Sequence, residues 1–132
     1  MSALAIAQDE HRQLTTEVMD AVAVHLGMPP IAVYEVATFY TMYDLQPVGK
    51  HKLCVCTNLP YALSDATEAA AHLKKKLSME FGGTTTDGKF TLKEGECMGA
   101  CAMAPVVLVN DKKMHDYLSP DKIDALIDSL AK

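Results

Sequence analysis

The chain has 132 residues, 49% of them apolar, which is enough for one modest hydrophobic core and too little for two ordinary domains. Its formal net charge of −5 argues against binding to nucleic acid or an anionic membrane, because phosphate binding requires clustered lysine and arginine. The sequence contains no apolar run near the roughly 18 residues of a membrane span and does not begin like a secretory signal peptide, so we expect a cytoplasmic protein without direct membrane insertion.

The first part of the chain, residues 1–47, is predicted to be helical. Two helices fit residues 1–27, the second capped by Thr15 or Thr16 and ended by Gly27. Pro29 and Pro30 are placed to open a third helix, because a proline in the first turn lacks only an N–H that would be unbonded anyway.

This third helix is apolar over most of its circumference, so we expect neighbours to cover it on more than one side. Its apolar residues are Ile31, Val33, Tyr34, Val36, Ala37 and Phe39. Pro47 and Gly49 mark a linker after it, which predicts one main domain over residues 48–132 with the helical segment 1–47 as an appendage.

The second part of the chain alternates strands and helices. The segment "HKLCVCTN" is typical of a strand, and apolar residues at steps of three and four from Leu63 to Leu77 predict a helix, with the lysines at 74–76 on its solvated face. Strands through Phe90 and along "PVVLVN" follow, and "DKKMHDYL" can pair with the latter as a hairpin. Ser119 and Pro120 then cap a last helix. This order predicts an α/β fold with a small mixed sheet flanked by helices, in a thioredoxin-like layout.

Cys97 and Cys101 stand in the small-residue segment "GECMGACAMAPV". Small residues let the backbone approach an iron–sulfur cluster and point amide N–H groups at its thiolates, so the spacing suits a cluster site. Two buried structural cysteines remain an alternative. Thiol–disulfide exchange fits less well, because that chemistry uses two intervening residues at a helix start and this pair has three.

Cys56 ends the first strand of this part, where a strand-to-loop junction can bring it beside the later cysteine pair. Cys54 lies on the same face of that strand by alternation, and we interpret it as a small apolar residue packed in the sheet. Met98 and Met103, which flank the cysteine pair, are interpreted as packing residues.

The runs "PPIAVYEVATFYTMYDLQPVGKHKLCVCTNLP" and "GGTTTDGKFTLKEGECMGACAMAPVVLVND" resemble the E subunit of bacterial NADH:quinone oxidoreductase, respiratory complex I. The related small subunits of NAD-linked hydrogenases and formate dehydrogenases belong to the same family. The resemblance extends from about Leu4 to Leu130, with motifs that match in order, spacing and flanking residues.

This resemblance implies a thioredoxin-like ferredoxin domain that binds one [2Fe–2S] cluster and is preceded by a short, truncated helical bundle. The family's helical region normally starts some tens of residues earlier, so a neighbouring subunit is expected to cover apolar surface on residues 3 to 40, unless that surface stays exposed. The family's cluster pattern is Cys-x4-Cys, a long gap, then Cys-x3-Cys. Cys56, Cys97 and Cys101 occupy three of these four positions, and Tyr61 occupies the remaining one.

Tyr61 at a ligand position leaves several outcomes open. Its phenolate can ligate iron, Cys54 can substitute for the missing thiolate, another ligand can complete the set, or the cluster is labile or absent. Under the last outcome the chain is a cluster-less structural subunit of the same complex.

The function implied by the resemblance is electron transfer within an NADH dehydrogenase complex, in the peripheral arm of an inner-membrane assembly. The chain has no complete active site of its own, and no residue is expected to act as a catalytic acid, base or nucleophile. FMN and NADH are expected on a partner subunit, because Gly82 and Gly83 do not form a dinucleotide-binding fingerprint. Other peripheral-arm subunits are further expected partners.

A zinc module is a third hypothesis, using Cys56, Cys97, Cys101 and either His51 or His115. Zinc accepts four mixed cysteine and histidine ligands, but neither histidine has a typical finger spacing. The histidines at 11, 25, 72 and 115 are otherwise interpreted as surface or half-buried residues.

Overall fold

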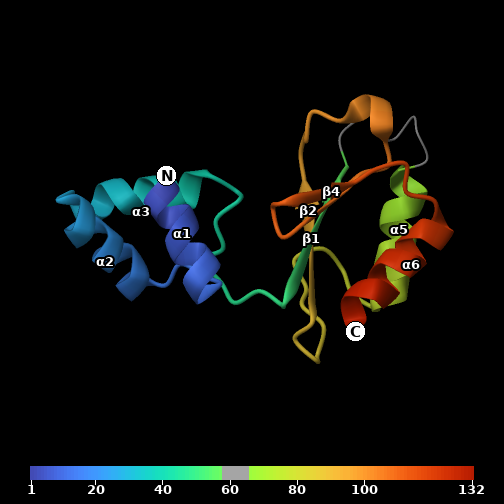
Figure 1. Cartoon of the computed structure of the whole chain (residues 1–132), viewed down its shortest axis with the longest axis horizontal. Coiled ribbons are helices and arrows are strands. Elements are labelled where there is room, and N and C mark those ends of the chain that lie inside the picture. Colours follow the sequence, from blue (N-terminus) through green and yellow to red (C-terminus); the bar gives the residue numbers. More distant parts are fainter. Residues whose placement is uncertain (58–65) are drawn as a thin grey trace. The chain divides into compact units, whose positions relative to one another are not determined.

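The computed structural model describes residues 1–57 and 66–132 (Figure 1). The chain divides into two compact units, Met1–Val48 and Gly49–Lys132, each with hydrophobic clusters of its own. In the described residues, no helix combines the length and the apolar character that a membrane crossing requires.

The first unit consists of three helices: α1 (Ser2–His11), α2 (Thr16–Leu26) and α3 (Pro30–Phe39). The predicted boundaries of α2 are confirmed, because the Thr15 side chain accepts a hydrogen bond from the Val18 N–H and Gly27 ends the helix with a φ of 63°. Pro30 occupies the first turn of α3, as expected. The core of this unit consists of Leu4, Leu14, Met19, Val22, Ala23, Val33, Ala37 and Tyr43.

Helix α3 is covered mainly on one side within its own unit. Val33 and Ala37 are buried, and Tyr34 and Val36 are partly buried against the same hydrophobic cluster. Ile31 is 62% exposed and Phe39 is 77% exposed. That a neighbouring subunit covers these exposed residues stays a prediction.

The second unit contains β1 (His51–Cys56), α5 (Ala66–Leu77), β2 (Phe90–Gly95), the short 3-10 helix η1 (Cys101–Met103), β3 (Val107–Val109), β4 (Lys113–His115) and α6 (Pro120–Ala131). Its sheet has the order β2-β1-β3-β4. Strand β2 runs parallel to β1, whereas β3 runs antiparallel to both β1 and β4. The predicted mixed sheet is therefore confirmed, as is the predicted hairpin of β3 and β4.

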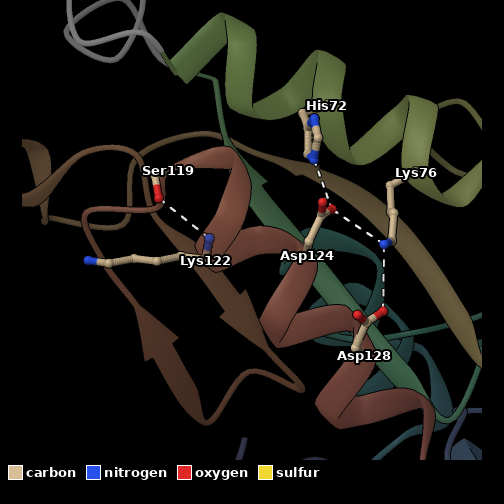
Figure 2. A network of polar contacts seen from close by, with 6 residues as sticks. All are labelled: His72, Lys76, Ser119, Lys122, Asp124 and Asp128. Carbon is tan, nitrogen blue, oxygen red and sulfur yellow. Dashed lines mark hydrogen bonds and ion pairs between the residues drawn. The ribbon is translucent and has the colours of Figure 1, made fainter.

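Helices α5 and α6 contact each other and share one hydrophobic core with the sheet (Figure 1). Leu53 and Val55 of β1 meet Leu73 of α5 and Ile123 of α6 there, all of them almost fully buried. Polar contacts join the two helices at their surface, where Asp124 of α6 contacts His72 and Lys76 of α5 (Figure 2).

Candidate iron–sulfur site

Cys56 lies at the end of β1, and the parallel pairing of β1 with β2 determines its neighbours. In this register Cys56 is opposite Gly95, the last residue of β2, so both strands deliver their carboxyl ends to the same edge of the sheet. Glu96, the first residue after β2, lies against Cys56. The Cys56 thiol donates a hydrogen bond of 2.6 Å to the Glu96 carbonyl oxygen. Cys97 is the next residue along the chain.

Cys97 and Cys101 belong to a tight loop between β2 and β3. Gly99 allows the turn, because its φ of 69° is a conformation that other residues rarely adopt, and its N–H lies 3.4 Å from the Cys97 sulfur. Cys101 opens the 3-10 helix η1. Both cysteines are exposed, whereas Cys56 is buried in a small cluster with Ala100 and Val106.

Cys97 and Cys56 both influence the thiol of Cys101. The pKa of the Cys101 thiol is raised by partial desolvation, then by a hydrogen bond with Cys97 and by the negative charge of Cys97 and Cys56. The end of β1 and the η1 turn lie at the same end of the sheet (Figure 1), and Cys56 N and the Val106 carbonyl oxygen lie 3.5 Å apart. The structure therefore brings together the three cysteines that the sequence singled out.

The donor chemistry of this site suits a thiolate-bound cluster better than a single ion. In residues 1–57 and 66–132, no three His, Cys, Asp or Glu side chains stand close enough to hold one metal ion. A [2Fe–2S] cluster has separate protein ligands on each of its two irons, so three cysteines that bind it need not share one coordination sphere. The loop is open to its surroundings at Gly99, where an added Cβ would meet no heavy atom within 4 Å.

Tyr61, the predicted fourth position, lies outside the described residues. Cys54 is half-buried in the sheet, as expected, on the same face of β1 as Cys56. Burial is the main cause that raises the pKa of the Cys54 thiol. The Cys54 sulfur packs closely over Gly95, because a Cβ at residue 95 would lie 2.7 Å from it.

The zinc hypothesis is not supported for either histidine. His51 begins β1 and Cys56 ends it, and five residue steps along the strand separate them by about 16 Å, which is too far for one coordination sphere. His115 lies on β4 opposite Val107. Burial is the main cause that lowers the pKa of its imidazole. Neither histidine joins a metal-binding group among the residues the structure describes.

Two contributors to the site escaped sequence reasoning. The Glu96 carbonyl accepts the hydrogen bond of the Cys56 thiol, and Tyr117 lies against η1 through a 2.9 Å hydrogen bond from its N–H to the Met103 carbonyl. Both are backbone contacts, which any residue type can make, so no residue pattern announces them. Only the pairing of the strands and the path of the loops reveals them.

Comparisons with known proteins show the family of the chain. The family model described as thioredoxin-like [2Fe–2S] ferredoxin matches residues 1–131. An NADH-quinone oxidoreductase E subunit of Rhizobium meliloti (strain 1021) is 43% identical over 129 residues, which cover 98% of this chain and 76% of the relative. The NADH-quinone oxidoreductase E subunit of Rickettsia conorii (strain ATCC VR-613 / Malish 7) is 46% identical over 117 residues, covering 89% of this chain and 70% of the relative.

Solved structures show the same fold. A chain of an NAD+-reducing [NiFe]-hydrogenase in the H2-reduced state aligns with a TM-score of 0.82 at 20% identity, covering 98% of this chain and 22% of the hydrogenase chain. The wild-type thioredoxin-like [2Fe–2S] ferredoxin from Aquifex aeolicus aligns with a TM-score of 0.52 at 19% identity, covering 64% of this chain and 88% of the ferredoxin. With the match over residues 1–131 and relatives at 43–46% identity, the chain belongs to the thioredoxin-like [2Fe–2S] ferredoxin family, in the group of the NADH-quinone oxidoreductase E subunits.

Proposed function

We propose that this chain is the electron-transfer subunit of an NADH:quinone oxidoreductase and holds one [2Fe–2S] cluster. The observation that carries the proposal is the convergence of Cys56, Cys97 and Cys101 at one end of the sheet, in a chain 43% identical to an NADH-quinone oxidoreductase E subunit. The cluster-less alternative leaves this convergence of three thiols without a purpose.

In this proposal Cys56 holds the cluster from the protein interior, while Cys97 and Cys101 hold it from the surface loop. When bound, the cluster supplies a site that accepts and releases a single electron. The Gly99 N–H stabilises negative charge on the Cys97 sulfur, to which it already points. Ala100 and Val106 are buried beside Cys56 and keep water from that side of the cluster.

The assembly is proposed from the same relatives. NADH and FMN belong to a partner subunit, with which this chain exchanges electrons in the peripheral arm on the cytoplasmic side of an inner-membrane complex. Residues 1–47 form a helical domain and residues 48–132 the ferredoxin domain, and the division into compact units at Val48 and Gly49 supports that assignment.

Reconstitution tests the proposal directly. The full chain, incubated anaerobically with iron and sulfide, should take up about two irons per chain and give a [2Fe–2S] EPR signal on reduction. Cys56→Ser and Cys97→Ser should each lower iron retention strongly, whereas Cys54→Ala, two residues from Cys56 on the same strand, should retain it. A colourless, iron-free wild-type chain under these conditions would contradict the proposal.

The fourth ligand position has its own experiment. Tyr61→Cys restores the thiolate that the family pattern places there, so it should slow the loss of iron to a chelator relative to the wild-type chain. Tyr61→Phe keeps the ring and removes the hydroxyl, which is the only group of the side chain that can ligate iron, so it tests the phenolate by itself. If neither variant changes the rate of iron loss, residue 61 does not face the cluster.

A further inference from the structure

Tyr117 lies beside the cysteine loop although it is far from it in sequence. Its N–H donates a 2.9 Å hydrogen bond to the carbonyl oxygen of Met103, the last residue of η1. The next N–H, that of Leu118, lies 3.1 Å from the Pro105 carbonyl. Because η1 begins at Cys101, the segment at 117 lies against the turn that presents this cysteine.

The backbone of Tyr117 has a conformation that a tyrosine rarely adopts. Its φ is 46°, in the left-handed region that favours glycine, asparagine and aspartate. Its carbonyl oxygen accepts hydrogen bonds of 3.1 Å from the Ser119 N–H and from Lys122 Nζ. The backbone is therefore held on both sides in a conformation that an asparagine would take more readily.

The ring of Tyr117 packs little against the rest of the chain, so its burial does little to offset this backbone strain. The residue is 56% exposed, and the adjacent Leu118, at 5%, carries the contact with the hydrophobic core. A bulky aromatic side chain at a strained and exposed position therefore contributes little to folding. An observed backbone outlier of this kind, next to a site, points to a functional reason for the residue.

We propose that the Tyr117 ring is a docking residue for the flavin-bearing redox partner, an inference that rests on the proposed function. Cys97 and Cys101 are exposed, so a protein that exchanges electrons with a cluster on them must approach this surface. Ala102 on η1 is also exposed, and the exposed Tyr117 is hydrogen-bonded through its backbone to Met103, the next residue of the same turn. Tyrosine is among the residue types that dominate binding energy at protein interfaces.

The test measures binding and stability of the full chain in parallel. Tyr117→Asn removes the ring and relieves the backbone, so its thermal midpoint should equal or exceed that of the wild-type chain. Its Kd for the purified NADH- and flavin-binding subunit should rise about tenfold, which is the effect of losing an interface aromatic. Tyr117→Phe keeps the ring and should bind nearly as well as the wild-type chain.

Ser78→Asn is the matched control. Ser78 is exposed, has a φ of 52° and follows α5, so this variant relieves the same kind of backbone strain without touching an aromatic ring. It should leave the Kd unchanged. An unchanged Kd for Tyr117→Asn overturns the proposal, as does a lowered thermal midpoint with loss of iron, which would show a structural role.

The two proposals fail in different ways. If the wild-type chain takes up no iron but Tyr117→Asn still weakens binding, the docking role stands and the cluster assignment fails. If the wild-type chain takes up iron but does not bind the flavin subunit, the docking proposal and the choice of partner both fail.

Discussion

At the scale of single residues, the side chain of Cys54 fills the space in which a side chain at residue 95 would lie. A Cβ at residue 95 would lie 2.7 Å from the Cys54 sulfur and 2.9 Å from the Met98 methyl carbon. Gly95→Ala should therefore destabilise the chain by about 1–3 kcal/mol, the usual effect of overpacking, as measured by urea unfolding.

The double variant Gly95→Ala with Cys54→Ala distinguishes this contact from a backbone effect. Removing the Cys54 sulfur clears the closer of the two clashes, while the Met98 methyl lies at the end of a flexible side chain. The two substitutions together should then cost less than the sum of the single variants, a coupling that a double-mutant cycle measures. Strict additivity would show that the Cys54 sulfur is not what excludes a side chain at residue 95.

The residues of the site were predictable to different degrees. The sequence alone proposed Cys56, Cys97 and Cys101 as ligands, because cysteine thiolates bind metals and clusters and the spacing of these three is characteristic. The contact of Cys54 with Gly95 depends on the pairing of β1 with β2, which brings residues 41 positions apart together. Such contacts are absent from any local pattern, and Tyr117 escaped prediction for the same reason.

At the scale of elements, the N-cap of α6 has a measurable contribution. The Ser119 side chain accepts a hydrogen bond of 3.4 Å from the Lys122 N–H, which would otherwise lack an intrahelical partner (Figure 2). Ser119→Ala should lower the free energy of unfolding by about 1 kcal/mol. Ser129→Ala makes the same chemical change within α6 and should cost less, because alanine is the better helix former there. Equal losses for the two variants would contradict a capping role.

The contact between α5 and α6 should depend on pH through Asp124. The hydrogen bond with His72, at 2.9 Å, is the main cause that lowers the pKa of Asp124, and the charge of Lys76 adds to it (Figure 2). The pKa of an unfolded aspartate is about 3.9. A carboxyl whose pKa is lower in the folded state stabilises the fold fully at pH values above its unfolded pKa, and this effect is lost as pH falls through the folded pKa.

Asp124→Asn should therefore be less stable than the wild-type chain at pH 7, and this difference should shrink as pH falls below the unfolded pKa and disappear only below the folded pKa. Chemical unfolding at pH 7 and through the acid range measures it. Asp128→Asn is the control, because Asp128 is 68% exposed and contacts only Lys76 in this network, at 3.6 Å. Its loss should be smaller than that of Asp124→Asn at pH 7. A difference for Asp124→Asn that stays the same from pH 7 down through the acid range would exclude the carboxylate as its cause.

Elements with local signals were predicted best. Thr15, Gly27 and Ser119 mark helix ends through their own chemistry, and the structure has helix ends at all three. Helix α3 was predicted in its span, but an apolar circumference does not tell which side its own unit covers. The parallel direction of β2 relative to β1 likewise depends on the crossover through α5, and no residue within either strand encodes it.

At the scale of the whole molecule, charge and core are divided between the two units. Residues 1–48 contain six acidic side chains against one arginine, whereas residues 49–132 contain eleven of each sign, so the net charge of −5 belongs to the helical unit. The hydrophobic clusters follow the same division. One lies within the helical unit, and the sheet core and the cluster around Cys56 lie within the other unit.

Because each unit closes its own core, the fragment of residues 49–132 should fold without the helices. It should unfold cooperatively in urea by far-UV circular dichroism and take up as much iron as the full chain, which serves as the reference. Its net charge near zero favours precipitation, so moderate salt and low protein concentration belong in the experiment. A gradual transition with exposed hydrophobic surface would show that the ferredoxin-like unit needs the helices for its fold. A cooperative fragment that fails to retain iron would instead show that the helices contribute to holding the cluster.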